Sequence, residues 1–446
     1  MKEKIFNGII GLCVGDALGV PVEFESRESL MNNPVTDMRG YGTYNMPPGT
    51  WSDDTSMTLC LVDSLSNGLD YADIMQKFIS WIDNAEYTPH GEVFDVGIAT
   101  RKALSRFADG VEPLLCGGIS EKDNGNGSLM RILPLLFYLK SQYVDSFTDS
   151  DVAFDIIHNV SSLTHAHKRS QIACGIFLSV ADELSRVNGG VEHGIWKARK
   201  HYESKGDFAE ELKHFQRVFS DDFKSLPERE IRSSGYVVDA LEAALWCLLN
   251  TDSYESCILK AVNLGEDTDT VAAVAGGLAG MLYGLESIPE KWLNQIFRID
   301  YIKELCEAFY FSLCKSSAER LYSYIPYFEN IDPDTAYQWK GGVKRDDGAI
   351  SVPYPDYDET LPQFIHDVYK SGLMDYNYRD TIERKTNGQS KDKRELIDSA
   401  DLEFVFAILT YFVRGERFCD GLWEAAVRDG VFLAILRRLS VLLLTR

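Results

Sequence analysis

Apolar residues recur along this chain at the three- and four-residue spacing of helices. That spacing covers residues 5–20, 59–65, 74–82, 132–139, 152–160 and 172–184, and a further apolar segment covers 271–285. Residues three and four apart share one face of a helix, so this periodicity predicts helices that bury one side. Alternation of the kind that marks strands is rare. The pattern therefore predicts an all-α fold.

Two of the predicted helices carry glycine at regular intervals. They hold Gly8, Gly11, Gly15 and Gly19 in the first and Gly276, Gly280 and Gly284 in the second. Small residues on one face of a helix allow a neighbouring helix to approach closely. We expect close helix contacts along both stretches.

A change in composition after Leu321 indicates a second domain. Tyr, Pro and Asp crowd residues 322–358, and helical spacing returns in residues 413–439. We place the boundary near residue 325, which gives a domain of residues 1–325 and a smaller helical domain of residues 326–446.

The charge balance narrows the range of partners. The chain holds 45 basic and 68 acidic residues, a net charge of −23. This charge repels a phosphate backbone, so nucleic acid is disfavoured as the main partner. An anionic substrate would need local positive charge from bound metal ions or from a few arginines.

The cysteines and the apolar segments indicate in which cellular compartment the protein is expected. Nine cysteines are scattered singly with no CxxC pair, which is typical of reduced, buried thiols, and we predict a cytoplasmic protein. The apolar N-terminus resembles a signal peptide, but Asp16 interrupts it. The apolar segment 271–285 is shorter than the ~20 residues that span a bilayer. We therefore predict no targeting signal and no membrane-spanning segment.

Two pairs of acids each precede a predicted helix. Asp53 and Asp54 lie in Trp51-Ser-Asp-Asp-Thr, and Asp267 and Asp269 lie in Gly265-Glu-Asp-Thr-Asp-Thr. An acid at a helix start is ordinarily a cap, which would explain either pair alone. No Lys or Arg occurs within residues 51–76 or 261–290 to neutralise them. If the two helix starts meet, the carboxylates raise one another's pKa values and oppose folding unless a cation joins them.

Oxygen ligands narrow the choice of cation. Ser52, Thr55 and Thr270 add hydroxyl groups beside the four aspartates. Carboxylate and hydroxyl oxygens are hard ligands that favour Mg²⁺, Mn²⁺ or Ca²⁺ over Zn²⁺, which prefers Cys and His.

Three segments together resemble the ADP-ribosylglycohydrolase family. They are GLCVGDALGVPVEFE at 11–25, WSDDT at 51–55 and GEDTDTVAAVAGGLAG at 265–280, and the resemblance covers roughly residues 1–320. It implies a compact helical core and two divalent ions, Mg or Mn. The implied ligands are Ser52, Asp53, Asp54, Asp267, Asp269 and Thr270. The family usually has Thr where this chain has Ser52, which keeps the hydroxyl. The C-terminal part looks like a small domain of unknown function that some members carry.

The same resemblance implies a catalytic carboxylate. Glu23 falls at the glutamate of the family's GDxxGxxxE motif, which reaches the metal centre or the substrate, with Glu25 as the alternative register. We assign the general base to Glu23 or to an acid of the metal cluster, Asp54 or Asp267, and leave that choice open.

Further residues are candidates for binding substrate. Asp95 lies in FDVGIATRKAL, a pattern seen in the family's arginine-specific branch, and would otherwise cap a helix. In Asn124-Gly-Asn-Gly-Ser-Leu-Met-Arg131, the N–H groups of Gly127 and Ser128 and the fork of Arg131 could hold an anion, although a plain turn uses the same residues. The family's motif at this position implies the diphosphate of ADP-ribose.

Two more positions remain open between binding and structure. The resemblance places His165 beside the ligand, but Thr164 could simply cap a helix next to a satisfied histidine. Tyr236 could stack on adenine or belong to the core.

The predicted reaction is hydrolysis at C1 of ADP-ribose, which releases it from an acceptor such as arginine, serine or an acetyl ester. The partners would be an ADP-ribosylated protein or a small ADP-ribose conjugate, with no membrane involved and the oligomeric state open. Two rivals stand beside it: a two-metal phosphoesterase or pyrophosphatase, for which the same aspartates serve, and a module that binds ADP-ribose without turnover.

Overall fold

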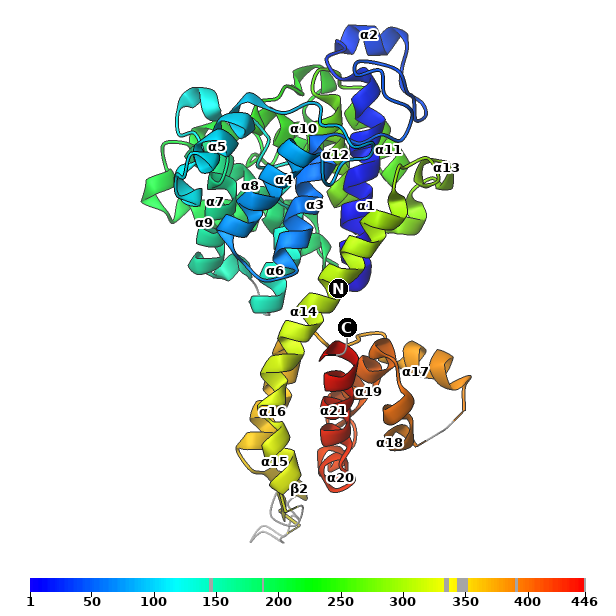
Figure 1. Cartoon of the computed structure of the whole chain (residues 1–446). Helices are drawn as coiled ribbons and strands as arrows, with labels where there is room; N and C mark the ends of the chain where they lie inside the picture. Colours follow the sequence, from blue (N-terminus) through cyan, green and yellow to red (C-terminus); the bar gives the residue numbers. More distant parts are fainter. Residues whose placement is uncertain (144–146, 187, 333–336, 343–351, 390–391, 445–446) are drawn as a thin grey trace. The chain divides into compact units, whose positions relative to one another are not determined.

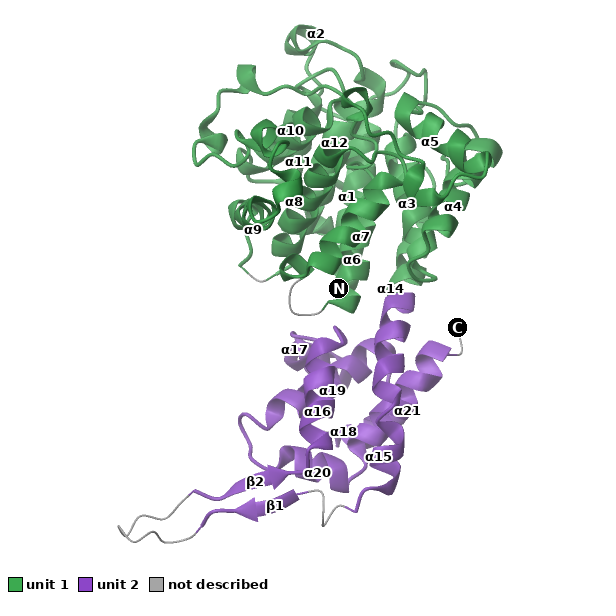
Figure 2. Cartoon of the chain, turned by 90° about the vertical axis from the view of Figure 1, so that its left-hand side faces the viewer, with its two compact units in different colours: residues 1–310 green, residues 311–446 purple. Residues whose placement is uncertain are grey.

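The computed structural model describes residues 1–143, 147–186, 188–332, 337–342, 352–389 and 392–444. Within these ranges the chain is almost entirely helical, with a single two-stranded sheet, so the predicted all-α class is confirmed. The chain divides into two compact units, residues 1–310 and 311–446 (Figure 2). The division falls inside one helix, α14 (Ile299–Tyr322), whereas the boundary predicted from composition lies near residue 325.

The first unit is built from helices joined by loops and short 3₁₀ turns. Its helices are α1 Lys2–Gly19, α2 Arg27–Asn32, α3 Asp53–Leu65, α4 Tyr71–Asn84, α5 Ile98–Ala108, α6 Leu133–Gln142, α7 Asp151–Ser162, α8 Lys168–Leu184, α9 Val191–Glu203, α10 Val237–Leu249, α11 Tyr254–Val262, α12 Thr268–Tyr283, α13 Glu290–Leu293 and the start of α14.

Helices α1 and α12 pack against each other through their glycines (Figure 1). A Cβ on Gly15 would lie 2.1 Å from the Ala272 carbonyl oxygen, and one on Gly19 would lie 2.3 Å from the Asp269 Cα. Contacts this short exclude any side chain, because real Cβ atoms stay beyond about 3 Å. The two glycine stretches expected to allow close helix contact therefore contact each other, and the end of α1 lies against the start of α12.

The loop expected over residues 24–49 contains one short helix, α2. Ser26 begins it, since its hydroxyl accepts the Ser29 N–H at 3.2 Å. Six residues are too few for apolar periodicity to reveal a helix.

The longest apolar helix is buried inside the first unit. Within the described residues, Lys2–Val22 is the one segment long and apolar enough to cross a membrane. Of its most apolar window, 89% is buried, which is the burial of a core helix.

The second unit is a smaller helical body with one hairpin. Its elements after α14 are α15 Ile325–Asn330, β1 Tyr337–Lys340, β2 Tyr354–Tyr357, α16 Thr360–Lys370, α17 Tyr378–Thr386, α18 Lys393–Leu396, α19 Leu402–Gly415, α20 Leu422–Arg428 and α21 Val431–Leu444. The strands pair antiparallel, with Tyr337 opposite Tyr357. Phe328, Phe364 and Phe432 form its aromatic core, with ring centroids 4.9–5.6 Å apart.

Candidate active site

The two acid-headed helix starts meet in the first unit. The Thr270 hydroxyl at the start of α12 donates to Asp54 Oδ2 at the start of α3, at 3.2 Å. Oxygen atoms of Asp16, Asp54 and Asp269 lie within 4.8 Å of one another, and so do oxygen atoms of Glu23, Asp267 and Asp269. Asp269 thus belongs to both groups. We call the six acids gathered here the acid cluster: Asp16, Glu23, Asp53, Asp54, Asp267 and Asp269.

Helix capping does not explain these acids. The Ser52 hydroxyl caps α3 by accepting the Asp54 N–H at 3.3 Å. Asp16, which comes from α1, accepts the N–H groups of Ser52 and Thr55 at 3.0 Å and the Thr55 hydroxyl at 2.6 Å. Asp267 stands at the N-cap position of α12, but its side chain makes no capping bond. Capping therefore does not account for Asp53, Asp54 or Asp267, while Asp269 Oδ1 accepts the Thr270 N–H at 2.8 Å.

Three carboxylate oxygens of the cluster are buried without a hydrogen-bond partner. They are Glu23 Oε2, Asp54 Oδ1 and Asp269 Oδ2. A buried charged oxygen that lacks a partner costs several kcal/mol, roughly, so such atoms are rare unless a ligand binds them. Their arrangement calls for positive charge from outside the chain.

The pKa values of the cluster point the same way. Burial, followed by the charge of Asp95, raises the pKa of Glu23 to about 9. Burial raises the pKa of Asp16 to about 6, despite the hydrogen bonds that lower it. Burial and then neighbouring carboxylates raise the pKa of Asp53 and Asp54 well above the usual range. No basic side chain is among the groups that shift these values.

The residues present fit divalent metal ions. All the donors are hard oxygens, and two groups of acids that share Asp269 match two neighbouring ions. The hydroxyls of Ser52 and Thr270 both lie at 3.2 Å from Asp54 Oδ2, so they stand where ligands are expected. Asp16 is the exception, because its oxygens already accept hydrogen bonds from Ser52 and Thr55.

Asp95 lies beside the cluster and does not cap a helix. Helix α5 begins three residues later at Ile98, with Gly97 at its N-cap position, so the capping alternative is wrong. The Tyr44 hydroxyl donates to Asp95 Oδ1 at 2.7 Å. The backbone of Asp95 is left-handed, with φ at 56°. Its half-buried carboxylate has a raised pKa, mainly through burial.

The glycine-rich loop is tied to the cluster by one amide. Asn126 Nδ2 donates to Asp267 Oδ2 at 2.8 Å, and the Asn126 N–H donates to the Gly235 carbonyl at 3.1 Å. Among the described residues, no acceptor is bonded to the N–H of Gly127 or Ser128. These two N–H groups can serve an anion, as at a helix start. A Cβ on Gly127 would lie 2.9 Å from His165 Cε1, so a side chain there would have to displace the histidine ring.

Arg131 and the Ser128 side chain are placed differently from the expectation. The Arg131 guanidinium is fully buried, donates to the Gly127 carbonyl and lies 4.9 Å from the Phe78 ring. The buried Ser128 hydroxyl accepts from Ser161 Oγ at 3.0 Å. Arg131 therefore supports the loop from inside, and its side chain is not open to a phosphate in this structure. Burial lowers the pKa of Arg131 to about 10, so the side chain stays charged while it supports the loop.

His165 and Tyr236 flank the same loop. His165 Nδ1 and Thr164 Oγ1 are 2.8 Å apart, and burial lowers the histidine pKa to about 3, so the ring is neutral. Tyr236 stands at the N-cap position of α10 and is half-buried. Its ring lies 5.7 Å from the Arg169 guanidinium. Both side chains border the loop, His165 as buried support and Tyr236 with part of its ring accessible.

Three residues of this site were not assigned a role from sequence. Asp16 had a signal, since it is the one charged residue within 5–22, in an otherwise apolar run. Asn126 lies inside the glycine-rich loop, but turn chemistry alone accounts for an asparagine there. Tyr44 gave no signal, because its partner Asp95 is far away in the sequence.

A second group, of two acids and a histidine, also places its ligand atoms at metal-binding distances. Glu121, His167 and Glu211 each place a ligand atom within 4.8 Å of the others. Here the Arg169 guanidinium donates to Glu121 at 3.0 and 3.1 Å and to Glu211 at 2.8 Å. We call these residues the Arg169 group. Its positive charge comes from the chain itself, so it needs no ion.

Comparison with known proteins agrees with this geometry. The ADP-ribosylglycohydrolase family matches residues 1–319, and a family of unknown function (DUF6508) matches residues 314–444. The chain is 34% identical over 311 residues to the ADP-ribosylarginine hydrolase Tri1 of Serratia proteamaculans, covering 69% of this chain and 79% of that protein. It is 32% identical over 300 residues to the ADP-ribosyl-[dinitrogen reductase] glycohydrolase of Rhodospirillum rubrum, covering 66% and 91%. A solved structure described as an ADP-ribosylglycohydrolase-related protein complex has a TM-score of 0.55 and 30% identity, covering 69% of this chain and 97% of that one.

Proposed function

Because the chain belongs to the ADP-ribosylglycohydrolase family, we propose that it hydrolyses the bond between C1 of ADP-ribose and an arginine side chain. The observation that carries the proposal is the acid cluster, with three buried carboxylate oxygens that lack partners. The reaction leaves positive charge on the ribose as the guanidine departs, and carboxylates stabilise such charge.

Two divalent ions, Mg²⁺ or Mn²⁺, complete this site in the proposal. The proposed ligands are Ser52, Asp53, Asp54, Asp267, Asp269 and Thr270. When bound, such ions polarise the ribose hydroxyls and a water molecule. Asp16 holds the start of α3 in place, which positions Asp53 and Asp54.

Glu23 is the proposed general base. Its Oε2 is buried without a partner, and its pKa, raised to about 9, makes it a strong proton acceptor once cations bound nearby have ionised it. Asp267 is less suited, since its Oδ2 already accepts the Asn126 amide. Asp54 Oδ1 also lacks a partner, but Asp54 is a proposed metal ligand, so the proposal assigns the base to Glu23.

The arginine acceptor is supported by Asp95. Its carboxylate is half-buried and close enough to Glu23 for its charge to raise the pKa of Glu23. The Tyr44 hydroxyl, which donates to Asp95 Oδ1, orients it. A carboxylate binds a guanidinium through two parallel hydrogen bonds, which a serine acceptor cannot make. The relative at 34% identity is named for ADP-ribosylarginine.

The other end of the substrate would lie along the glycine-rich loop. The unbonded N–H groups of Gly127 and Ser128 suit the diphosphate, and the partly accessible Tyr236 ring suits adenine. His165 supports Gly127 from inside the fold.

The test uses the purified full chain with peptides ADP-ribosylated on arginine or on serine. Treatment with EDTA should stop release, and Mn²⁺ or Mg²⁺ should restore it. Intact ADP-ribose as the product supports a glycosidic hydrolase, whereas AMP would identify a pyrophosphatase. Asp269→Asn should remove the activity, with the exposed Asp252→Asn as the matched control. Equal release from serine and arginine peptides would contradict the role of Asp95.

A further inference from the structure

The second unit contains a cavity of about 500 Å³ that has no part in the acid cluster. All of its lining residues belong to residues 378–422, on helices α17 and α19, the turn after α17, the starts of α18 and α20, and the segment that leads into α20. A volume of this size is typical of small-molecule sites, which run from roughly 300 to 1,000 Å³.

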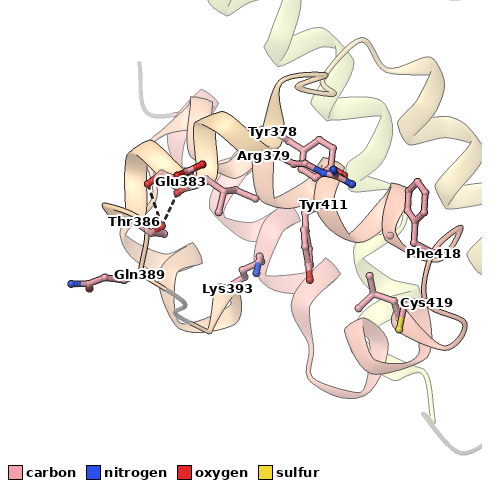
Figure 3. A pocket seen from close by; sticks show the side chains of 13 residues that line it. Tyr378, Arg379, Glu383, Thr386, Gln389, Lys393, Tyr411, Phe418 and Cys419 are labelled. Carbon is pink, nitrogen blue, oxygen red and sulfur yellow. Dashed lines mark hydrogen bonds between the residues drawn. The ribbon is translucent and has the colours of Figure 1, made fainter.

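The cavity walls are aromatic and apolar. Tyr378, Tyr411 and Phe418 supply rings, while Ile382 and Leu422 supply aliphatic surface. Figure 3 shows Tyr411 projecting between Lys393 on one side and Phe418 and Cys419 on the other. The Phe418 ring is 73% exposed, so an apolar surface remains for a ligand to cover. Flat aromatic walls favour a flat ring system.

Two positive charges in this cavity lack a carboxylate partner. The Lys393 ammonium lies 4.1 Å from the Tyr411 ring centroid, and the Arg379 guanidinium lies 5.8 Å from the Tyr378 ring. Neither forms an ion pair with any described residue, although Glu383 also lines the cavity. Their neighbours Arg384 and Lys385 do pair, with Glu403 and Asp401.

We propose that this cavity binds a small aromatic anion of the mononucleotide class, a flat base that carries a phosphate. The base would stack on the tyrosine rings, since stacking on an aromatic side chain tolerates any base. The phosphate would accept hydrogen bonds from Lys393 and Arg379, which suit phosphate as a point charge and a planar fork. This binding site does not depend on the reaction proposed for the first unit.

Cys419 provides a readout confined to this cavity. It lines the cavity and is the exposed cysteine, whereas the other eight are buried. Its alkylation by iodoacetamide in the full chain, followed by mass spectrometry, reports the cavity even if a nucleotide also binds in the first unit. AMP at ten times its Kd should slow alkylation about tenfold by simple occupancy. Adenosine, which lacks phosphate, and inorganic phosphate, which lacks the base, should each protect far less.

Two lysine variants, one inside the cavity and one outside it, each remove one positive charge. Lys393→Gln should require about tenfold more AMP for equal protection, because one charged hydrogen bond is lost. Lys370→Gln removes an exposed charge outside the cavity and should leave protection unchanged. Thermal melting of both variants checks that they fold. No protection by millimolar AMP would overturn the proposal, as would equal behaviour of the two variants or protection only by an acidic peptide.

Discussion

The acid cluster and the Arg169 group both gather carboxylates at metal-binding distances, but only the second contains its own positive charge. Arg169 reaches Glu121 and Glu211 with three hydrogen bonds, and the pKa of Glu121 is lowered by Arg169. In the acid cluster the pKa of Glu23 is raised by burial and by another acid. Distance between ligands therefore does not by itself identify a metal site. The sign of the pKa shift separates a satisfied group from one that needs a cation.

The strongest test of this comparison is to remove Asp269, the acid that belongs to both groups of the acid cluster. Asp269→Asn should lower turnover by more than about a hundredfold, beyond the losses seen when groups around a metal ligand are removed. In EDTA the same variant should melt at a higher temperature than the natural chain, because one buried unpaired carboxylate is gone. Scanning calorimetry with and without Mn²⁺ measures both effects. Normal turnover, or a lower melting temperature in EDTA, contradicts the cluster.

A variant of Asp16 tests whether this acid contributes only by holding the start of α3 in place. Asp16→Asn keeps one acceptor oxygen but turns an amide toward donors of Ser52 or Thr55, so the start of α3 should shift. We expect metal affinity and kcat to fall about tenfold. Asp70→Asn is the matched control, since Asp70 caps α4 by accepting the N–H groups of Ala72 and Asp73. Isothermal titration with Mn²⁺ should show the loss in the first variant alone.

The Arg169 group offers the reverse experiment. Arg169→Met removes its cation and should lower the melting temperature by several degrees, because Glu211 is left partly buried and unpaired. Added Mn²⁺ should offset part of that loss, since the group then needs a cation. Arg199→Met removes an exposed pair with Glu203 and should change melting little. If the Arg169 variant melts like the natural chain, that group gains nothing from its arginine.

Glu242 combines features of both groups, since it is buried like the acid cluster but has an arginine partner like the Arg169 group. We expect the smallest effect there. Burial raises its pKa to about 7 although Arg217 lies 2.9 Å away. A raised folded-state pKa contributes stability that is present below the unfolded value and lost as pH rises through 7. Glu242→Gln should therefore melt a few degrees higher than the natural chain at pH 8 and about equally at pH 4. Melting curves across that range give the difference, and a constant offset at every pH would contradict it.

Local patterns predicted the fold class and a close helix contact for each glycine-bearing helix, whereas the structure shows that these two helices contact each other. Helical spacing is a property of neighbouring residues, and glycine intervals report contact faces directly. The meeting of the two acid pairs could be inferred because each lacked a basic neighbour in sequence. The family resemblance is confirmed over residues 1–319.

Other features depended on tertiary contacts that no local pattern contains. Arg131 belongs to a motif typical of phosphate binding, yet its buried guanidinium donates to the Gly127 carbonyl and packs on the Phe78 ring. Asn126 and Asp267 are 141 residues apart and meet only in the folded chain. The cavity of the second unit is lined by residues from four helices and two connecting segments, none of which carries a recognisable motif. The ligand roles of the site residues stay predictions until metal binding is measured.

The raised pKa values of Asp53, Asp54 and Asp269, caused mainly by burial, have a consequence for how the centre would be filled. Near neutral pH, a cluster without ions would hold protons on these acids, which must ionise to act as ligands. Binding of metal ions would therefore release hydrogen ions, and the affinity of the cluster for metal should rise steeply with pH. Calorimetry in two buffers of different ionisation enthalpy would count the hydrogen ions expelled. Acidification would then empty the centre and leave the chain folded, as a reversible off state.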